Sequence, residues 1–134
     1  MKRFILSCVL IVLGILTNNA QTAKKEISVV TPDKIEAYYF HFNARCETCR
    51  AVESEAKSDI ETLYPGKATF QAVNMDDAAG KLIADRLKIS GQTLLIVKGN
   101  KRINLTNEGF MYATTNPAKL KSIIKQKVDN QLGK

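Results

Sequence analysis

The segment Ile35-Glu-Ala-Tyr-Tyr-Phe-His-Phe-Asn-Ala-Arg-Cys-Glu-Thr-Cys-Arg-Ala-Val-Glu53 carries the clearest structural signal in this chain. Its first part, Ile35 to Phe42, is rich in aromatic side chains and nearly continuous in apolar character, which is typical of a central strand buried on both faces. Apolar residues then recur every three or four positions and predict one buried helix face, made of Cys49, Val52, Ala56, Ile60 and Leu63. Cys46 and Cys49 therefore lie where a strand gives way to a helix.

Downstream of this segment we expect a second strand and a second helix. Pro65-Gly66 ends the first helix, and residues 68–75 read as a strand. Asp76 or Asp77 can cap the second helix, which Ser90-Gly91 breaks. The predicted apolar face of this helix consists of Ala79, Leu82, Ile83 and Leu87.

The remainder of the chain predicts a hairpin and a last helix. Residues 93–97 read as a strand, Gly99-Asn100 as a tight turn, and residues 102–106 alternate polar with apolar side chains, so the two strands should pair antiparallel. Residues 107–115 give no clear assignment. Asn116-Pro117 is an N-cap followed by proline at the first helical position. The buried stripe of this helix would be Leu120, Ile123, Ile124, Val128 and Leu132, and its solvated face Lys119, Lys121, Lys125 and Lys127.

The order strand, helix, strand, helix, hairpin, helix indicates an α/β fold. We expect a central mixed sheet that contains a β-α-β unit, with helices packed on both of its faces. A length of 134 residues suits one domain, and 45% hydrophobic with 25% charged residues excludes a disordered chain.

The first twenty residues predict a cleaved signal peptide. Lys2 and Arg3 precede an apolar run from Phe4 to Leu16, and Ala20 offers a small residue for cleavage. The run is short for a membrane span, which disfavours an uncleaved anchor. Lipidation at Cys8 is disfavoured because too few apolar residues precede it. We therefore divide the chain into a signal peptide, 1–20, and one domain, 21–134, that is periplasmic or secreted.

After a polar leader, residues 27–30 read as a short edge strand stopped by Thr31-Pro32-Asp33. Removal of the signal peptide takes Cys8 with it and leaves Cys46 and Cys49. The odd number of cysteines in the full chain is thereby explained, and the pair enters a compartment in which disulfide chemistry is possible.

The Cys46-Glu-Thr-Cys49 spacing carries the chemistry of this chain. Two intervening residues let both sulfur atoms meet across the first helical turn, where unsatisfied amides and the helix dipole favour negative charge. A thiolate at Cys46 would be stabilised there and supply a nucleophile. Cys49 lies on the buried stripe and would act as the resolving thiol. Arg45 and Arg50 also favour a thiolate, whereas Glu47 opposes it.

Three other interpretations of the two cysteines stay open. A structural disulfide would close a very small loop and restrain the unfolded chain little. A zinc site normally needs four ligands, and beyond the two cysteines only His41 is available after the signal peptide. Copper(I) bound by two thiolates is the remaining metal candidate, although we expect no metal. Two inert free thiols are disfavoured in an oxidising compartment.

The stretch from Ile35 to Leu132 resembles a thioredoxin-like domain. The resemblance rests on the strand that ends in Phe42, on the Cys46-x-x-Cys49 helix start, on residues 73–76 closing the next strand, and on residues 89–97 leading into the third strand. It implies a thioredoxin-like fold.

Residues 39–53 are more narrowly similar to a bacterial thioredoxin-like group labelled nitrophenyl-compound nitroreductase subunit (ArsF-like). No flavin-binding signature stands out in the sequence, and we expect no cofactor.

The chain departs from thioredoxins at four places around the cysteines. Arg45 stands in place of their tryptophan, and Glu47-Thr48 in place of their Gly-Pro. Phe40 occupies the position of their buried acid, six residues before the first cysteine. Their cis-proline is replaced by Gln92 or lost beside Gly91, and because cis bonds without proline are costly, we expect a trans Gly91-Gln92 peptide.

Together these observations predict an extracytoplasmic thiol-disulfide oxidoreductase. Cys46 would attack a substrate disulfide and Cys49 would resolve the mixed disulfide, with protein thiols or disulfides and a redox protein as partners. The resemblance implies that Gln92 and Thr93 lie beside the sulfur atoms and offer hydrogen bonds to an extended substrate. The alternative is a thioredoxin-fold binding or accessory module, docking a partner or carrying copper, which the missing acid and proline favour.

The formal net charge of +7 adds little to this interpretation. No interleaving of aromatic and basic residues is typical of a nucleic-acid surface, so we expect no nucleic-acid partner. An acidic partner or an anionic membrane surface stays open. We expect a monomer with no stable membrane span in residues 21–134.

Overall fold

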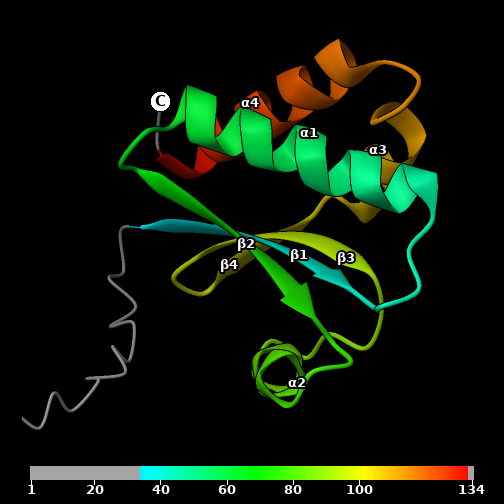
Figure 1. Ribbon diagram of the computed structural model, residues 1–134. Helices are drawn as coiled ribbons and strands as arrows, with labels where there is room; N and C mark the ends of the chain where they lie inside the picture. The colour runs from blue at the N-terminus through cyan, green and yellow to red at the C-terminus, as the bar shows by residue number, and fades with distance from the viewer. Residues whose placement is uncertain (1–33, 133–134) are drawn as a thin grey trace, which may run out of the picture.

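The computed structural model describes residues 34–132, which form a four-stranded sheet with helices on both faces (Figure 1). The strands are β1 (Ile35–His41), β2 (Ala68–Asn74), β3 (Thr93–Lys98) and β4 (Lys101–Asn104). The helices are α1 (Glu47–Leu63), α2 (Ala78–Arg86), α3 (Thr106–Tyr112) and α4 (Pro117–Leu132). The predicted signal peptide, 1–20, and the predicted strand at 27–30 lie outside the described residues.

The sheet has the order β2-β1-β3-β4 and is mixed, as the sequence predicts. β1 pairs in parallel with β2, so the segment from β1 through α1 to β2 is a β-α-β unit. β3 runs antiparallel to both β1 and β4, and the β3–β4 hairpin turns at Gly99 and Asn100. β1 is thus flanked on both sides, which accounts for its central position.

Side chains of β1 alternate between two apolar clusters, one on each face of the sheet. Ile35, Ala37 and Tyr39 join the cluster beneath α1 and α4, whereas Tyr38 and Phe40 join the cluster beneath α2. Figure 1 shows α1, α3 and α4 above the sheet and α2 below it. The continuous apolar run of β1 therefore follows from burial on both faces.

The long helices α1 and α4 show the buried stripe and the N-cap that the sequence predicts. Four of the five predicted face residues, Cys49, Val52, Ala56 and Ile60, are buried, and the fifth, Leu63, is half-buried at the end of the helix. At the start of α4, Asn116 Oδ1 accepts the Lys119 N–H at 3.1 Å and caps the helix.

The buried stripe of α4 comprises Leu120, Ile124 and Val128, with Ile123 half-buried. The side chain of Leu132 lies outside what the structure describes. All four predicted lysines of this helix are exposed. Lys121 nevertheless places its Nζ 3.5 Å from Oδ1 of Asp59, a buried residue of α1, so this lysine also links the two helices.

The predicted apolar face of α2 is wrong in two of its residues. Ala79 is exposed and Leu82 keeps 71% of its surface exposed, whereas Gly80 and Ala84 are buried together with Leu87. A methyl group at Gly80 would lie 1.8 Å from the Asn74 carbonyl oxygen, so the helix backbone approaches the end of β2 closely. The face of α2 that contacts the sheet therefore contains its small residues Gly80 and Ala84, whereas the large Leu82 points to solvent.

The region that the sequence left unassigned forms the short helix α3, and β4 ends at Asn104, two residues earlier than predicted. Asn104 Oδ1 accepts the Thr106 N–H at 2.9 Å, while Thr106 Oγ1 accepts the Leu94 N–H at 3.0 Å. These side-chain bonds turn the chain out of the hairpin and into the helix.

Among residues 34–132, none of the helices combines the length and the apolar character that a membrane crossing requires.

Candidate functional site

The two cysteines form a disulfide at the start of α1. The helix begins at Glu47, and Cys46 is its N-cap residue, with extended backbone angles of φ −79° and ψ 165°. The Sγ atom of Cys46 accepts the Cys49 N–H at 3.1 Å, which satisfies one of the free amides of the first turn. In the Cys46–Cys49 disulfide, the two Cα atoms lie 5.1 Å apart. The sulfur atoms thus lie in the positive field of the helix N-terminus.

The two cysteines differ sharply in exposure. Cys46 is exposed, whereas Cys49 keeps 3% of its surface accessible and belongs to the stripe that packs on the sheet. The first cysteine is therefore open to solvent, whereas the protein shields the second. The burial order agrees with the one expected from helical periodicity.

The loop between β1 and α1 is fixed by polar residues that follow β2. Asp76 Oδ2 accepts the backbone N–H of Asn43 at 2.6 Å, and the Asn74 side-chain amide donates to Asn43 Oδ1 at 2.8 Å. Because β1 and β2 are parallel, both strands end at the same edge of the sheet, next to the cysteines. The sequence analysis did not identify this network, although parallel strands that end in Asn and Asp were a usable signal.

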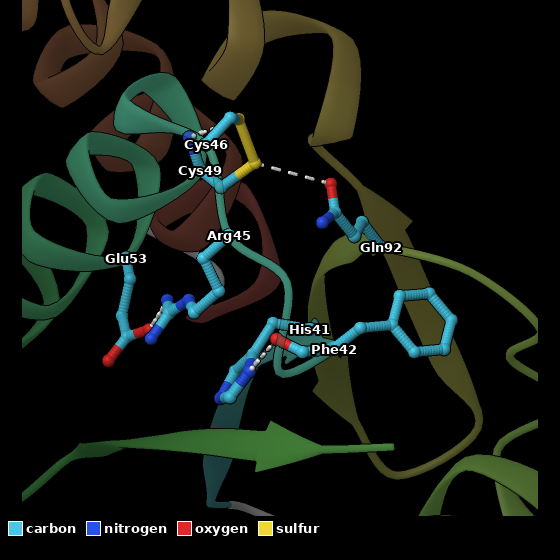
Figure 2. Close-up of a disulfide and its surroundings, with 7 residues drawn as sticks. All are labelled: His41, Phe42, Arg45, Cys46, Cys49, Glu53 and Gln92. Carbon is cyan, nitrogen blue, oxygen red and sulfur yellow. Dashed lines mark hydrogen bonds and ion pairs between the residues drawn. A yellow bond between two sulfur atoms is a disulfide. The ribbon is translucent and has the colours of Figure 1, made fainter. Parts of the chain in front are cut away.

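Gln92 contacts the disulfide from the segment that precedes β3. Its Oε1 atom lies 3.5 Å from Sγ of Cys49, and Figure 2 shows its side chain reaching toward the buried sulfur atom. The register pair Phe40–Thr93 brings this segment to the end of β1, directly before the cysteine loop. The Gly91–Gln92 peptide is trans, as are the other described peptide bonds in residues 34–132.

Thr93, the second residue expected at the substrate surface, is 8% exposed. Its hydroxyl donates to the Gly91 carbonyl at 2.9 Å, so it shapes the segment that carries Gln92. A direct contact between Thr93 and a substrate stays a prediction.

Arg45 does not face the sulfur atoms, contrary to the expectation that it supports a thiolate. Its guanidinium forms an ion pair with Glu53, one of the polar residues of α1, and lies 6.0 Å from the centre of the Tyr39 ring. Figure 2 shows the Arg45 and Glu53 side chains turned toward each other and away from the disulfide. Arg50 is exposed. Arg45 precedes the helix, so no helical spacing could have predicted its partner.

His41 is a satisfied histidine at the rim of the sheet. Its Nδ1–H donates to the Phe42 carbonyl at 3.1 Å, and its ring stacks near Tyr39. Within residues 34–132, no group of three or more His, Cys, Asp or Glu side chains is placed to hold a metal ion.

No acid takes the place that Phe40 occupies. Phe40 is fully buried among apolar residues on the α2 face of the sheet. The one buried carboxyl group among the described residues belongs to Asp59, ten positions after Cys49 and therefore about 15 Å further along α1. Burial raises the pKa of Asp59, and the nearby Lys121 opposes that shift. Asp59 is too distant to take a proton from Cys49.

Comparison with solved structures identifies the fold. One chain of human ERp44, in its zinc-bound form, aligns with a TM-score of 0.51 at 18% sequence identity, over 72% of this chain and 28% of that one. An oxidised thioredoxin O2 from Arabidopsis thaliana aligns with a TM-score of 0.48 at 22% identity, over 70% of this chain and 75% of that one. The Drosophila melanogaster thioredoxin Deadhead aligns with 0.47 at 23% identity, over 70% and 81% of the two chains.

No protein-family model matches the sequence, and no curated protein matches it. The mixed sheet, the helices on both faces and the ERp44 alignment agree on a thioredoxin-like fold, as the sequence resemblance implies.

Proposed function

We propose that the protein is an extracytoplasmic thiol-disulfide oxidoreductase that works through Cys46 and Cys49. The observation that carries the proposal is the asymmetric pair at the start of α1, with an exposed first cysteine and a buried second one. A structural staple needs no such asymmetry, whereas a reaction with a second disulfide needs one reachable sulfur atom and one protected one.

In the reducing direction, the dithiol form of the protein acts in two steps. The Cys46 thiolate attacks one sulfur atom of a substrate disulfide, forms a mixed disulfide and releases one substrate thiolate. The Cys49 thiolate then attacks Cys46 Sγ, which closes the Cys46–Cys49 bond and releases the second substrate thiolate. Two electrons pass to the substrate, and its two thiolates take the two protons that the cysteines give up. The reverse sequence oxidises a substrate dithiol.

The helix start assists the first of these steps. Unpaired N–H groups and the helix dipole stabilise negative charge on Cys46, which is what makes a cysteine nucleophilic at neutral pH. Neither Arg45 nor a buried acid contributes, since Arg45 is paired with Glu53 and Phe40 is apolar. The reaction therefore rests on the helix and on the residues that touch the sulfur atoms.

The location and partners are part of the same proposal. The basic and apolar start of the chain supports export and cleavage after Ala20, which the N-terminal mass of the exported protein tests. Protein thiols and disulfides are the proposed substrates, with a separate redox protein to renew the dithiol. We also propose membership of the ArsF-like group, on the likeness of residues 39–53, without assigning nitroreduction.

Substitution of each cysteine tests the activity. Reduced wild-type protein should reduce the disulfides of insulin in the presence of dithiothreitol, and Cys46→Ala should show no rate above dithiothreitol alone. Cys49→Ala should accumulate a mixed disulfide that mass spectrometry detects, because the resolving thiol is gone. Ser54→Ala, an exposed position on the same helix, serves as the control and should match the wild type. Retained activity in Cys46→Ala would contradict the mechanism.

Among residues 34–132 no buried acid lies near Cys49, which favours one second candidate, a thioredoxin-fold module that binds a partner without turnover. Such a module would carry a dithiol that titrates but does not catalyse. Tight, stoichiometric copper(I) binding without insulin reduction would identify it and would be lost in both cysteine variants.

A further inference from the structure

Gln92 is the side chain that meets the buried sulfur atom. Its Oε1 atom lies 3.5 Å from Cys49 Sγ, and it belongs to a different part of the chain, 43 positions away. Figure 2 shows the carboxamide directed at the disulfide from the side opposite α1. The Phe40–Thr93 register pair fixes the backbone beside Gln92, so the contact is built by the sheet.

The kind of interaction between Gln92 and Cys49 changes with the redox state of the cysteines. In the disulfide, neither sulfur atom carries a hydrogen, so the 3.5 Å separation is a van der Waals contact. In the dithiol, the Cys49 S–H can donate to Oε1. In the thiolate, the sulfur atom needs a donor, which the same carboxamide provides through its NH₂ group. A half-turn about the last side-chain torsion exchanges the two ends at little cost, because that torsion is broad and roughly two-fold.

Other groups near Cys49 are already engaged or out of reach. Its backbone N–H is committed to Cys46 Sγ, and the Arg45 guanidinium is paired with Glu53. Phe40 is apolar, and Asp59 lies further along α1. Glu47 and Arg50, the other charged residues of the first turn, are exposed to solvent. The polar side chain in hydrogen-bonding reach of Cys49 Sγ among the described residues is that of Gln92.

We propose that Gln92 takes part in the second step of the reaction, as acceptor for the Cys49 thiol and then as donor to the Cys49 thiolate. This inference rests on the proposed function. The carboxamide itself takes no proton. Solvent water accepts the Cys49 proton, and Gln92 stabilises the resulting anion. Cys49 then attacks Cys46 Sγ, the bond between Cys46 and the substrate sulfur atom breaks, and the second substrate thiolate leaves.

A stoichiometric reaction with an aromatic disulfide separates the two steps. The protein is reduced with dithiothreitol, and the dithiothreitol is removed. The dithiol protein is then mixed with one equivalent of bis-nitrobenzoate disulfide in a stopped-flow instrument. The coloured thionitrobenzoate anion is released once when Cys46 attacks and once when Cys49 resolves. The two rates therefore report the two steps within one experiment.

Two variants of Gln92 and one control complete the design. Gln92→Glu keeps the shape but loses the NH₂ donor and adds a like charge beside the thiolate, and Gln92→Met removes both polar ends. We expect the second release to slow by about tenfold to a hundredfold in Gln92→Glu and by about tenfold in Gln92→Met, while the first release changes by less than about twofold. Gln126→Glu makes the same substitution at an exposed position of α4 and should match the wild type.

The outcomes distinguish this inference from the function on which it rests. A wild-type protein that releases one equivalent and stops overturns the oxidoreductase proposal itself. If the wild type releases two equivalents, an unchanged or faster second release in Gln92→Glu overturns the role of Gln92. Equal slowing of both releases also overturns it, because such slowing indicates a structural disturbance and not a role in the second step.

Discussion

The two faces of the sheet are closed by different kinds of contact. On one face α2 lies alone, and its Gly80 brings helix backbone against the Asn74 carbonyl at the end of β2. On the other face α1, α3 and α4 pack through side chains, and polar groups are buried among them. Tyr64 and Asp59 are two of these polar residues. The stability of the α2 face should therefore depend on the absence of a side chain at Gly80. The stability of the face beneath α1, α3 and α4 should depend on the hydrogen bonds of its buried polar groups.

Gly80→Ala should have the largest effect on stability. The added methyl group would lie 1.8 Å from a backbone oxygen, so α2 must move away from the sheet. We expect the free energy of unfolding to fall by about 3 kcal/mol, the upper end for overpacking, as measured by chemical denaturation.

Gly109→Ala on the opposite face is the matched control for this substitution. Its methyl group would meet the Val52 Cγ1 atom at 3.0 Å, the end of a side chain, and alanine also favours a helix. We expect a loss under about 1 kcal/mol. Equal losses in the two variants would remove the distinction between the two faces.

Tyr64→Phe should have an intermediate effect and sharpen the description of the face beneath α1 and α4. The Tyr64 hydroxyl donates to Asp129 Oδ1 at 2.9 Å and also lies 3.1 Å from the Lys125 carbonyl, and burial with this bond raises the pKa of Tyr64. Loss of the hydroxyl should lower the free energy of unfolding by about 1.5 kcal/mol.

Tyr39→Phe provides the comparison within the same face. The Tyr39 hydroxyl is buried and has no hydrogen-bond partner among the described residues, and burial raises its pKa. Its removal should leave the free energy of unfolding unchanged or raise it. A loss as large as that of Tyr64→Phe would show that Tyr39 has a partner.

Asp59→Asn should have a small effect, and one that depends on pH. Burial raises the Asp59 pKa above its ordinary value of 3.8, so the folded chain holds this proton more tightly than the unfolded chain. The ionised carboxylate therefore destabilises the folded state at neutral pH. Its contribution to the free energy of unfolding falls as the pH rises above 3.8.

The variant should accordingly unfold at a slightly higher temperature than the wild type near neutral pH. The difference should vanish at a pH below 3.8, where both states of the wild type are protonated. Glu61→Gln, at an exposed position of α1, should show no such pH-dependent difference. A constant difference at all pH values would contradict the assignment to Asp59.

Sequence reasoning succeeded where one physical effect dominated. The apolar run of β1 and the periodicity of α1 predicted the strand, the helix and the burial of Cys49, because β1 is buried on both faces and α1 is long and buries one continuous stripe. It failed for α2, where the large Leu82 is exposed and the small Gly80 makes the contact, because the needed approach is set by the end of β2. Seven residues of α3 were too few to show a period.

At the site, the sequence located the cysteines and the segment of Gln92 but not their surroundings. The spacing of Cys46 and Cys49 is local, and the position of Gln92 follows from the resemblance to thioredoxin-like domains. The pairing of Arg45 with Glu53, and the bonds that tie Asn43 to Asn74 and Asp76, depend on how the loop leaves β1. Such contacts are fixed by tertiary structure and have no signature in the spacing of the chain.

The strand register described above also sets an order of assembly. The β3–β4 hairpin pairs residues as near in sequence as Lys98 and Lys101, whereas β1 pairs Glu36 with Val97 across most of the described chain. Local hairpins close in microseconds, and distant pairings come later because they must first overcome the entropy of a long loop. The contact between Gln92 and Cys49 exists only once β1 has inserted beside β3. During folding, the thiols of Cys46 and Cys49 are therefore close to each other before Gln92 reaches Cys49 and makes the surroundings of the two thiols different.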